Sequence, residues 1–205
     1  MKEIESESRR AVLGAVAGLM GAGMAGLAVA GPVSASEGDA GPRQAWASKD
    51  KAVNIGPNAP PVCDALDMLM IQQCFARYGM GHDEGLGDVL ATLFTEDVVV
   101  EVADGHGAPF QVVRGREAVV ANFANSFRQQ GDQRRHCFTN IIVEEASANK
   151  ARVLAYALVS VAAHGGLILG AAVIYTADLR KAGGMWRFSR LFIGMDAYTT
   201  PKPKV

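Results

Sequence analysis

The chain has 205 residues, of which 49% are hydrophobic and 20% are charged, and its formal net charge is −1 at pH 7. This composition is typical of a globular protein, and the balanced charge excludes the broad basic surface that binds nucleic acid. Sequence motifs for familiar cofactors and metals are missing too, because no GxGxxG, P-loop, HExxH or CxxC pattern occurs. We therefore expect no nucleic acid, no cofactor and no metal among the partners.

Residues 1–35 have the features of an export signal. The pair Arg9–Arg10 precedes the uncharged run AVLGAVAGLMGAGMAGLAVA, and the small residues of Val33-Ser34-Ala35 follow it. This arrangement resembles a signal for the twin-arginine (Tat) export machinery, with a site that a signal peptidase would cleave. We predict a periplasmic or secreted protein. The run is also long enough to span a bilayer, so an uncleaved membrane anchor is the alternative.

One domain is predicted to follow the signal. Residues 36–62 are rich in Gly, Pro, Ala and Ser and lack periodicity, as expected of a linker or a surface arm. Residues 63–198 are enough for a single domain with its own core, and residues 199–205 form a tail.

The cysteines do not have the spacing of a metal site. They are Cys63, Cys74 and Cys137. We expect buried thiols, with a disulfide between Cys63 and Cys74 as the alternative in an oxidising compartment.

The first half of the domain has helical patterns. Apolar residues recur at spacings of three and four up to Tyr78, which predicts a helix with Asp64 as its N-cap. Gly79 and Gly81 are predicted to end this helix. A second helix is expected over residues 85–94. Two short strands, VVVEV and FQVV, should then precede a third helix that opens at Gly115 and stops at Gly131.

The second half reads as long strands separated by turn signals, at residues 135–145, 150–163, 167–180 and 185–197. Consecutive hairpins of this kind form an antiparallel meander. Helices followed by a meander predict an α+β domain, in which about three helices pack on one face of a curved antiparallel sheet and enclose a pocket.

The stretch RRHCFTN places polar side chains on one face of a predicted strand. Because strand side chains alternate, Arg134, His136, Phe138, Asn140 and Ile142 should share a face. His136 and Asn140 are then about 13 Å apart, so that they cannot touch but can line one long pocket.

Several motifs, in this order and spacing, resemble the SnoaL-like branch of the NTF2-like superfamily, which includes scytalone dehydratase, a dehydrochlorinase and polyketide cyclases. They are ARYGMGHDEG, LATLFTEDVVVEV, VVRGREAVVANF, RHCFTN and GGMWRFSR. The resemblance covers residues 63–197 and implies the cone-shaped fold of that family.

The resemblance also implies a catalytic pair, in which Asp83 and His136 stand at the positions of the family's aspartate and histidine. A buried carboxylate fixes which imidazole nitrogen carries the proton, and the other nitrogen can then act as a general base. We predict a lyase or isomerase that needs no cofactor. Tyr78, Asn140 and Phe94 are predicted to bind a small, largely apolar, oxygenated substrate.

Simpler interpretations exist for each residue of this site. A strand histidine is often structural, an aspartate after a helix is often a cap, and Tyr78 is equally a core residue. We expect His82 to be solvated at the helix end, and Asp104 and His106 to be loop residues rather than metal ligands. An arginine that the dehydrochlorinase has in its cavity is replaced here by Leu191, which argues against dehydrohalogenation.

Two other classes of function stay open. The chain could be an exported ligand-binding protein that uses the same pocket without chemistry, or an accessory subunit of an exported oxidoreductase. A large exposed apolar patch would favour the second. The resemblance further implies a homodimer or homotrimer, and the small side chains of LGAAV, residues 169–173, either widen the pocket or mark a subunit contact.

Overall fold

The computed structural model describes residues 55–58, 62–105 and 107–198. The predicted export signal, most of the predicted linker, His106 and the predicted tail lie outside the described residues. The elements in chain order are α3 (Ala65–Asp83), α4 (Gly87–Leu93), β1 (Phe94–Asp104), β2 (Gln111–Arg114), α5 (Arg116–Arg128), β3 (Gln133–Ala146), β4 (Lys150–Ala163), β5 (Gly166–Ala182) and β6 (Met185–Tyr198). No helix among the described residues is long and apolar enough to cross a membrane.

Helix α3 begins where the sequence predicts but continues past both glycines. The Asp64 side chain caps it by accepting the backbone N–H of Asp67 at 2.8 Å. At Gly79 a Cβ atom would lie 3.2 Å from Cβ of His136, and at Gly81 it would lie 3.2 Å from the Leu90 side chain. The glycines therefore serve close packing against β3 and α4 inside the helix, and the prediction that they end it is wrong.

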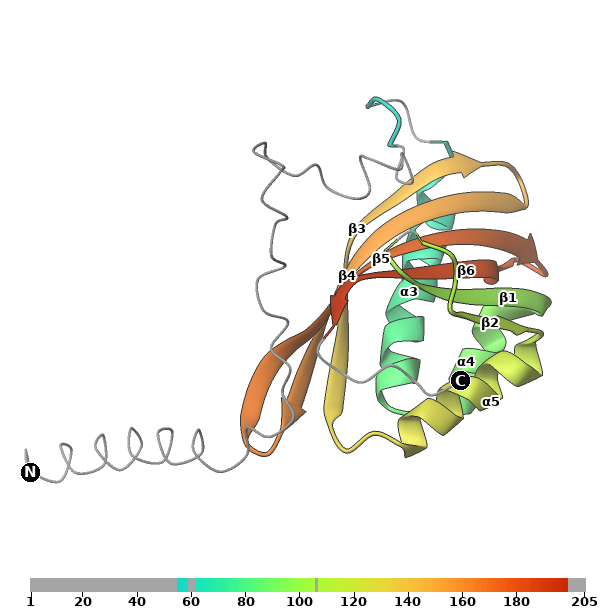
Figure 1. The fold of residues 1–205 in the computed structure, drawn as a ribbon. Coiled ribbons are helices and arrows are strands. Elements are labelled where there is room, and N and C mark those ends of the chain that lie inside the picture. Colours follow the sequence, from blue (N-terminus) through green and yellow to red (C-terminus); the bar gives the residue numbers. More distant parts are fainter. Residues whose placement is uncertain (1–54, 59–61, 106, 199–205) are drawn as a thin grey trace, which may run out of the picture. The chain divides into compact units, whose positions relative to one another are not determined.

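The sheet has six strands in the order β2-β1-β6-β5-β4-β3. The predicted meander is confirmed, because β3, β4, β5 and β6 pair antiparallel in succession. Strand β1 adds to β6 in parallel, a pairing between distant segments that the hairpin signals did not predict. The described helices cover one face of this open, mixed sheet (Figure 1), so the α+β prediction is confirmed.

The core lies between the helices and the inner face of the sheet. Alternate residues of β4, among them Val153, Ala155 and Ala157, point inward and meet Phe75 of α3 within one apolar cluster. This alternation is the period of a strand with one buried face.

A polar contact fastens the start of α3 to the end of the β5–β6 hairpin. Asp67 accepts hydrogen bonds from Lys181 Nζ at 2.6 Å and from Trp186 Nε1 at 2.8 Å. Both hydrogen bonds lower the pKa of Asp67 below its ordinary value, and the bond from Lys181 has the larger effect. The first turn of the helix is thereby fixed against the sheet, while its last turn reaches the inner face of β3.

Two bulges break the strand alternation assumed from the sequence. In β3 the register shifts between Thr139 and Ile142, and Asn140 takes a positive φ of 52°. Ile141, rather than the predicted Ile142, therefore packs against the core. In β6 the register shifts near Ser189, so that Arg190 lies on the outer face, where it pairs with Glu101.

The three cysteines are free thiols. Cys74 is buried, and burial raises the pKa of its thiol to about 11. Cys63 is partly exposed and Cys137 is exposed, so the expectation of buried thiols holds for Cys74 alone.

Candidate active site

Asp83 and His136 meet at the inner face of the sheet. Oδ1 of Asp83 lies 2.5 Å from Nδ1 of His136, and Oδ2 accepts the backbone N–H of His136 at 2.7 Å. A carboxylate can only accept, so Nδ1 carries the imidazole proton and Nε2 is the free acceptor. The Asp83 side chain is 5% exposed and the His136 side chain is 9% exposed. One carboxylate thus fixes both the backbone and the ring of His136.

Close approach of α3 to β3 makes this contact possible. Asp83 is the last residue of α3, and Gly79 stands one turn earlier on the same side of the helix. A Cβ atom at position 79 would lie 3.2 Å from Cβ of His136 and 3.2 Å from the ring of Phe138. Any larger residue at this position would push β3 away and lengthen the Asp83–His136 contact.

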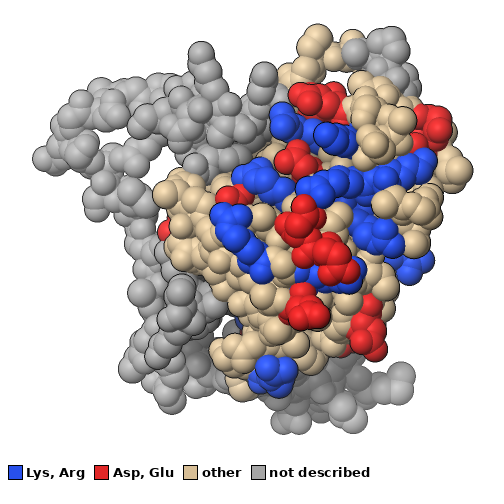
Figure 2. Space-filling model, turned by 90° about the vertical axis from the view of Figure 1, so that its right-hand side faces the viewer, with Lys and Arg blue, Asp and Glu red and all other residues tan. Residues whose placement is uncertain are grey.

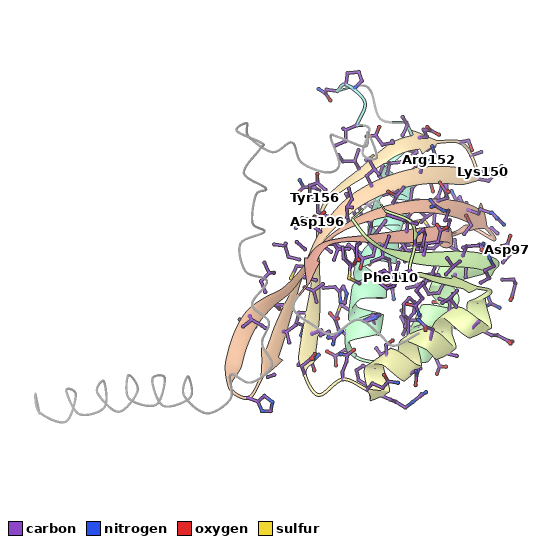
Figure 3. All side chains as sticks on the ribbon, in the orientation of Figure 1. Asp97, Phe110, Lys150, Arg152, Tyr156 and Asp196 are labelled. Atoms are coloured by element: carbon purple, nitrogen blue, oxygen red, sulfur yellow. The ribbon has the colours of Figure 1, made fainter. Side chains whose placement is uncertain are left out.

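A cavity of about 140 Å³ opens beside this pair, between the sheet and helices α3 and α5. Its wall on the sheet is mainly apolar, and its polar lining residues come from α3, β2, α5, β3 and β5. The lining residues are Tyr78, His82, Val102, Phe110, Gln111, Asn122, Phe123, Ser126, Arg134, His136, Val159, Val161, Gly170, Ala171, Val173, Tyr175, Ile193 and Met195. In Figure 3, Phe110 lies on the helix side of the sheet, whereas Asp97, Lys150 and Arg152 lie toward the end at the right of the view.

Two tyrosines lie side by side in the cavity wall. Tyr78 on α3 and Tyr175 on β5 are fully enclosed, and their hydroxyl groups form a hydrogen bond to each other. Burial raises the pKa of both phenols well above the ordinary value. Because one hydrogen bond uses one of the two hydroxyl protons, the other proton is available to a ligand.

The comparisons with known proteins agree with this architecture. A model of the SnoaL-like domain matches residues 64–191. The chain belongs to the SnoaL-like family. No sequence match is found among curated proteins.

Several solved structures have the same fold as this SnoaL-like chain. A protein of unknown function from Mycobacterium tuberculosis is 27% identical with a TM-score of 0.57, over 64% of this chain and 72% of that one. A putative scytalone dehydratase from Novosphingobium aromaticivorans is 22% identical with a TM-score of 0.58, over 68% of this chain and 91% of that one. A Catenulispora acidiphila protein in complex with S-DNPA is 25% identical with a TM-score of 0.56, over 65% of this chain and 96% of that one.

His82 is partly buried and lines the cavity, which corrects the expectation that it is solvated at the helix end. Its ring centroid lies 4.9 Å from that of His136 and 6.0 Å from that of Tyr78. Burial, followed by the nearby His136, lowers the pKa of His82 to about 3. A helix C-terminus favours a protonated histidine by only about 0.3–1 kcal/mol, and here the loss of solvent outweighs that effect.

Two of the predicted substrate-binding residues lie outside the cavity. Asn140 is exposed at the β3 bulge, so the predicted face shared by His136 and Asn140 does not exist. Phe94 is fully buried and packs edge-on against Tyr78, with the ring centroids 6.3 Å apart. Phe94 therefore supports a cavity residue from behind, and neither residue lines the cavity.

Sequence reasoning missed several polar cavity residues. His82 follows Tyr78 by one helical turn and therefore shares its face, a spacing that could have identified it. Arg134 precedes His136 by two residues on the same strand face, and Asp132 holds its guanidinium at 2.9 Å. Asn122 accepts a hydrogen bond from Gln111 at 3.0 Å, but this pair joins α5 to β2 and has no local sequence signal.

His82, Asp83 and His136 are the candidate metal ligands among the described residues, and they form a poor metal site. Possible ligand atoms of His82, Asp83 and His136 lie within 4.8 Å of one another. Both carboxylate oxygens of Asp83 are already engaged by His136. Two imidazoles remain, fewer than the three or four protein ligands of a zinc site. This donor set is better suited to proton transfer.

Proposed function

We propose that this chain is an exported SnoaL-like lyase or isomerase that acts without a cofactor on a small, largely apolar, oxygenated molecule. The observation that carries the proposal is the double contact of Asp83 with His136 beside an apolar cavity. An apolar ligand alone gives no reason for a buried carboxylate, whose desolvation is unfavourable unless it is paired.

His136 is the general base in this proposal. Asp83 holds Nδ1–H, so that Nε2 has its lone pair available to a C–H or O–H group in the cavity. When Nε2 takes a proton, the imidazolium forms next to the Asp83 carboxylate, which stabilises the positive charge. The same proton can return to another atom of the substrate, and the net reaction is an isomerisation or an elimination.

The cavity size supports a substrate with one ring. Its volume of about 140 Å³ is close to that of the engineered cavity of about 150 Å³ that binds benzene. Val159, Val161 and Val173 provide an apolar wall, and His136 is among the polar residues that line the same cavity. A protein of the same fold from Catenulispora acidiphila was solved in complex with S-DNPA.

The test is a screen of one-ring alcohols and ketones for dehydration, isomerisation and deuterium uptake from D₂O. Replacing His136 with Ala should abolish conversion of any compound that the wild-type protein converts, while circular dichroism stays unchanged. Wild-type turnover by the His136→Ala variant would disprove the role of His136 as the base.

Export is tested separately, because it depends on the leader and not on the cavity. The pair Arg9–Arg10 before an uncharged run supports it. Replacing both arginines with lysine should retain the protein in the cytoplasm of a bacterial host with a twin-arginine system. Fractionation followed by immunoblotting measures the distribution, and unchanged export would point to another route.

A binding or accessory role is the second candidate, and one surface feature favours it. Leu167, Ile168 and Leu169 at the start of β5 are 72%, 56% and 57% exposed, which is unusual for neighbouring aliphatic residues. The predicted homodimer or homotrimer could cover these side chains. Light scattering on the wild-type protein and on a Leu167→Glu variant would show whether they hold a second copy.

A further inference from the structure

The outer face of the sheet has an apolar centre that is enclosed. Leu154 on β4, Ile174 on β5 and Phe192 on β6 alternate along their strands with residues of the inner core and do not belong to that core. Their exposed fractions are 7%, 2% and 8%. The described helices cover the opposite face of the sheet (Figure 1). Apolar side chains on an open sheet face stay in contact with water, so these three need a cover. With two exposed neighbours they form the outer patch, which consists of Leu154, Tyr156, Leu158, Ile174 and Phe192.

A turn in the described part of the chain covers one margin of the outer patch. A Cβ atom added at Gly194 would lie 2.5 Å from the carbonyl oxygen of Gly105 and 3.1 Å from the Ile174 side chain, so the turn after β1 reaches Ile174. Leu154 lies two strands further along the sheet, because the strand order is β6-β5-β4. Two strand spacings are about 10 Å. Another segment must therefore cover Leu154.

The chain before residue 58 approaches the sheet at the edge where the outer patch begins. The backbone N–H of Gly56 donates a hydrogen bond to Oε2 of Glu144 at 3.1 Å. Glu144 is on the edge strand β3 and stands two residues from Ile142, which pairs with Leu154. From β3 to β6 is three strand spacings, or about 14 Å. An extended segment gains about 3.3 Å per residue, so residues 44–54 are long enough to cross the whole patch.

We propose that residues 44–54, QAWASKDKAVN, lie across the outer patch and that the ring of Trp46 covers its centre. Trp46 is the only aromatic residue before Phe75, and an alanine stands on each side of it. A flat indole ring can cover several aliphatic side chains at once. Because the arm belongs to the same chain, its effective concentration at the patch is far higher than that of a second copy.

Two other segments outside the described residues suit this patch less well. Residues 199–205, TTPKPKV, have no aromatic side chain and carry two lysines. The uncharged run of the leader is expected to be removed with the signal or to stay in a bilayer. A docked arm also has a consequence for partners. A second protein that approaches the outer patch must first displace the arm, whereas the exposed start of β5 stays accessible.

Nuclear Overhauser effects in the unmodified full chain test the contact directly. Ring protons of Trp46, assigned by their loss in Trp46→Phe, should show cross-peaks to methyl groups of Leu154 and Ile174. A mixture of isotopically labelled and unlabelled chains shows whether these cross-peaks arise within one chain. Cross-peaks between two chains, or cross-peaks from the methyl groups to residues 199–205 in place of Trp46, would overturn the proposal.

Stability provides a second measurement. Trp46→Ser should lower the ratio of folded to unfolded protein by about tenfold, because the outer patch then regains contact with water. Trp46→Phe retains an aromatic ring and should lower the ratio less. Urea denaturation of the full chain measures both. An unchanged ratio in Trp46→Ser would refute the proposed cover.

A double-mutant cycle separates this contact from general destabilisation. Trp46→Ser combined with Leu154→Ala should change the folded-to-unfolded ratio by a factor that differs about threefold or more from the product of the single effects. Leu66→Ala is the matched control, because Leu66 is 66% exposed on α3, which covers the opposite face of the sheet. Its effect should simply multiply with that of Trp46→Ser. Multiplicative behaviour in both pairs would show that Trp46 does not contact the outer patch.

Discussion

The domain has two sets of charged pairs that differ in their surroundings. His136 lines the cavity, Asp83 contacts its ring, and both side chains are nearly enclosed. The pairs Arg152–Asp178 and Arg180–Asp97 lie on the outer face of the sheet, where their side chains are 36–62% exposed. Figure 2, which views the domain from the right-hand side of Figure 1, shows basic and acidic side chains interleaved on that side.

Charged pairs with similar contact distances contribute differently to stability in the cavity and on the outer face. An exposed ion pair is screened by water and salt and contributes about 0–1 kcal/mol. A buried pair that loses one partner leaves a charged or polar group without solvent, which is far more unfavourable. The inner pair should therefore control activity, while the outer pairs should have little effect on it.

The largest effect is expected for Asp83→Asn. The amide retains the shape but places an N–H₂ group against either the backbone N–H or Nδ1–H of His136. The ring then loses its fixed tautomer, and turnover should fall by about 10³–10⁴-fold, as in other aspartate–histidine pairs. The measurement is initial rate on the compound that the wild-type protein converts.

Stability provides the matching control for this variant. A buried donor left without an acceptor lowers the free energy of unfolding by about 1–3 kcal/mol, so a folded variant with greatly reduced turnover is expected. An Asp83→Asn protein that retains more than a tenth of the wild-type rate would exclude the pair as the acid–base machinery.

Local signals were sufficient for the α+β fold, whereas half of the site came from the family resemblance. The likeness of ARYGMGHDEG and RHCFTN to the family's motifs identified the two residues that meet at 2.5 Å. Asn140 was misplaced because a bulge changes which side chains point inward, and RRHCFTN gives no sign of it. His82 was misjudged because burial depends on α5 and β3, which pack over the helix end from distant parts of the chain.

Gly79→Ala should produce the next largest effect, and mainly on activity. The added Cβ would lie 3.2 Å from both Cβ of His136 and the Phe138 ring, so β3 must shift by a few tenths of an ångström. Turnover should fall by about tenfold, because catalysis is sensitive to displacements of this order. Stability should change little, since Ala favours a helix over Gly by about 0.5–1 kcal/mol and offsets the crowding.

A matched glycine outside the site makes this result interpretable. A Cβ atom added at Gly131 would meet no other atom of the described residues within 4 Å, so Gly131→Ala should leave turnover unchanged. Equal rates for both alanine variants would show that the α3–β3 spacing does not position His136.

A smaller effect is expected in the pH dependence of stability. The pKa of His82 is about 3 in the folded protein and 6.5 in its ordinary state, so between these values the unfolded chain binds a proton that the folded chain excludes. Stability should therefore fall on acidification through this window, by up to about 1.4 kcal/mol per pH unit from this group. Urea unfolding between pH 7 and pH 4 should show a shallower decline for His82→Phe, and parallel declines would contradict the burial of a neutral His82.

The smallest effect is expected on the outer face, for Asp178→Asn. Arg152 loses a partner at 3.3 Å but keeps Glu145 at 3.6 Å and ready access to water. The free energy of unfolding should change by less than about 1 kcal/mol, the change should shrink further in high salt, and turnover should stay at the wild-type level. Chemical denaturation at low and high salt, with the rate assay beside it, measures all three. A large loss of turnover here would mean that the outer charges act on the cavity through the sheet, and the separation of the two faces would have to be abandoned.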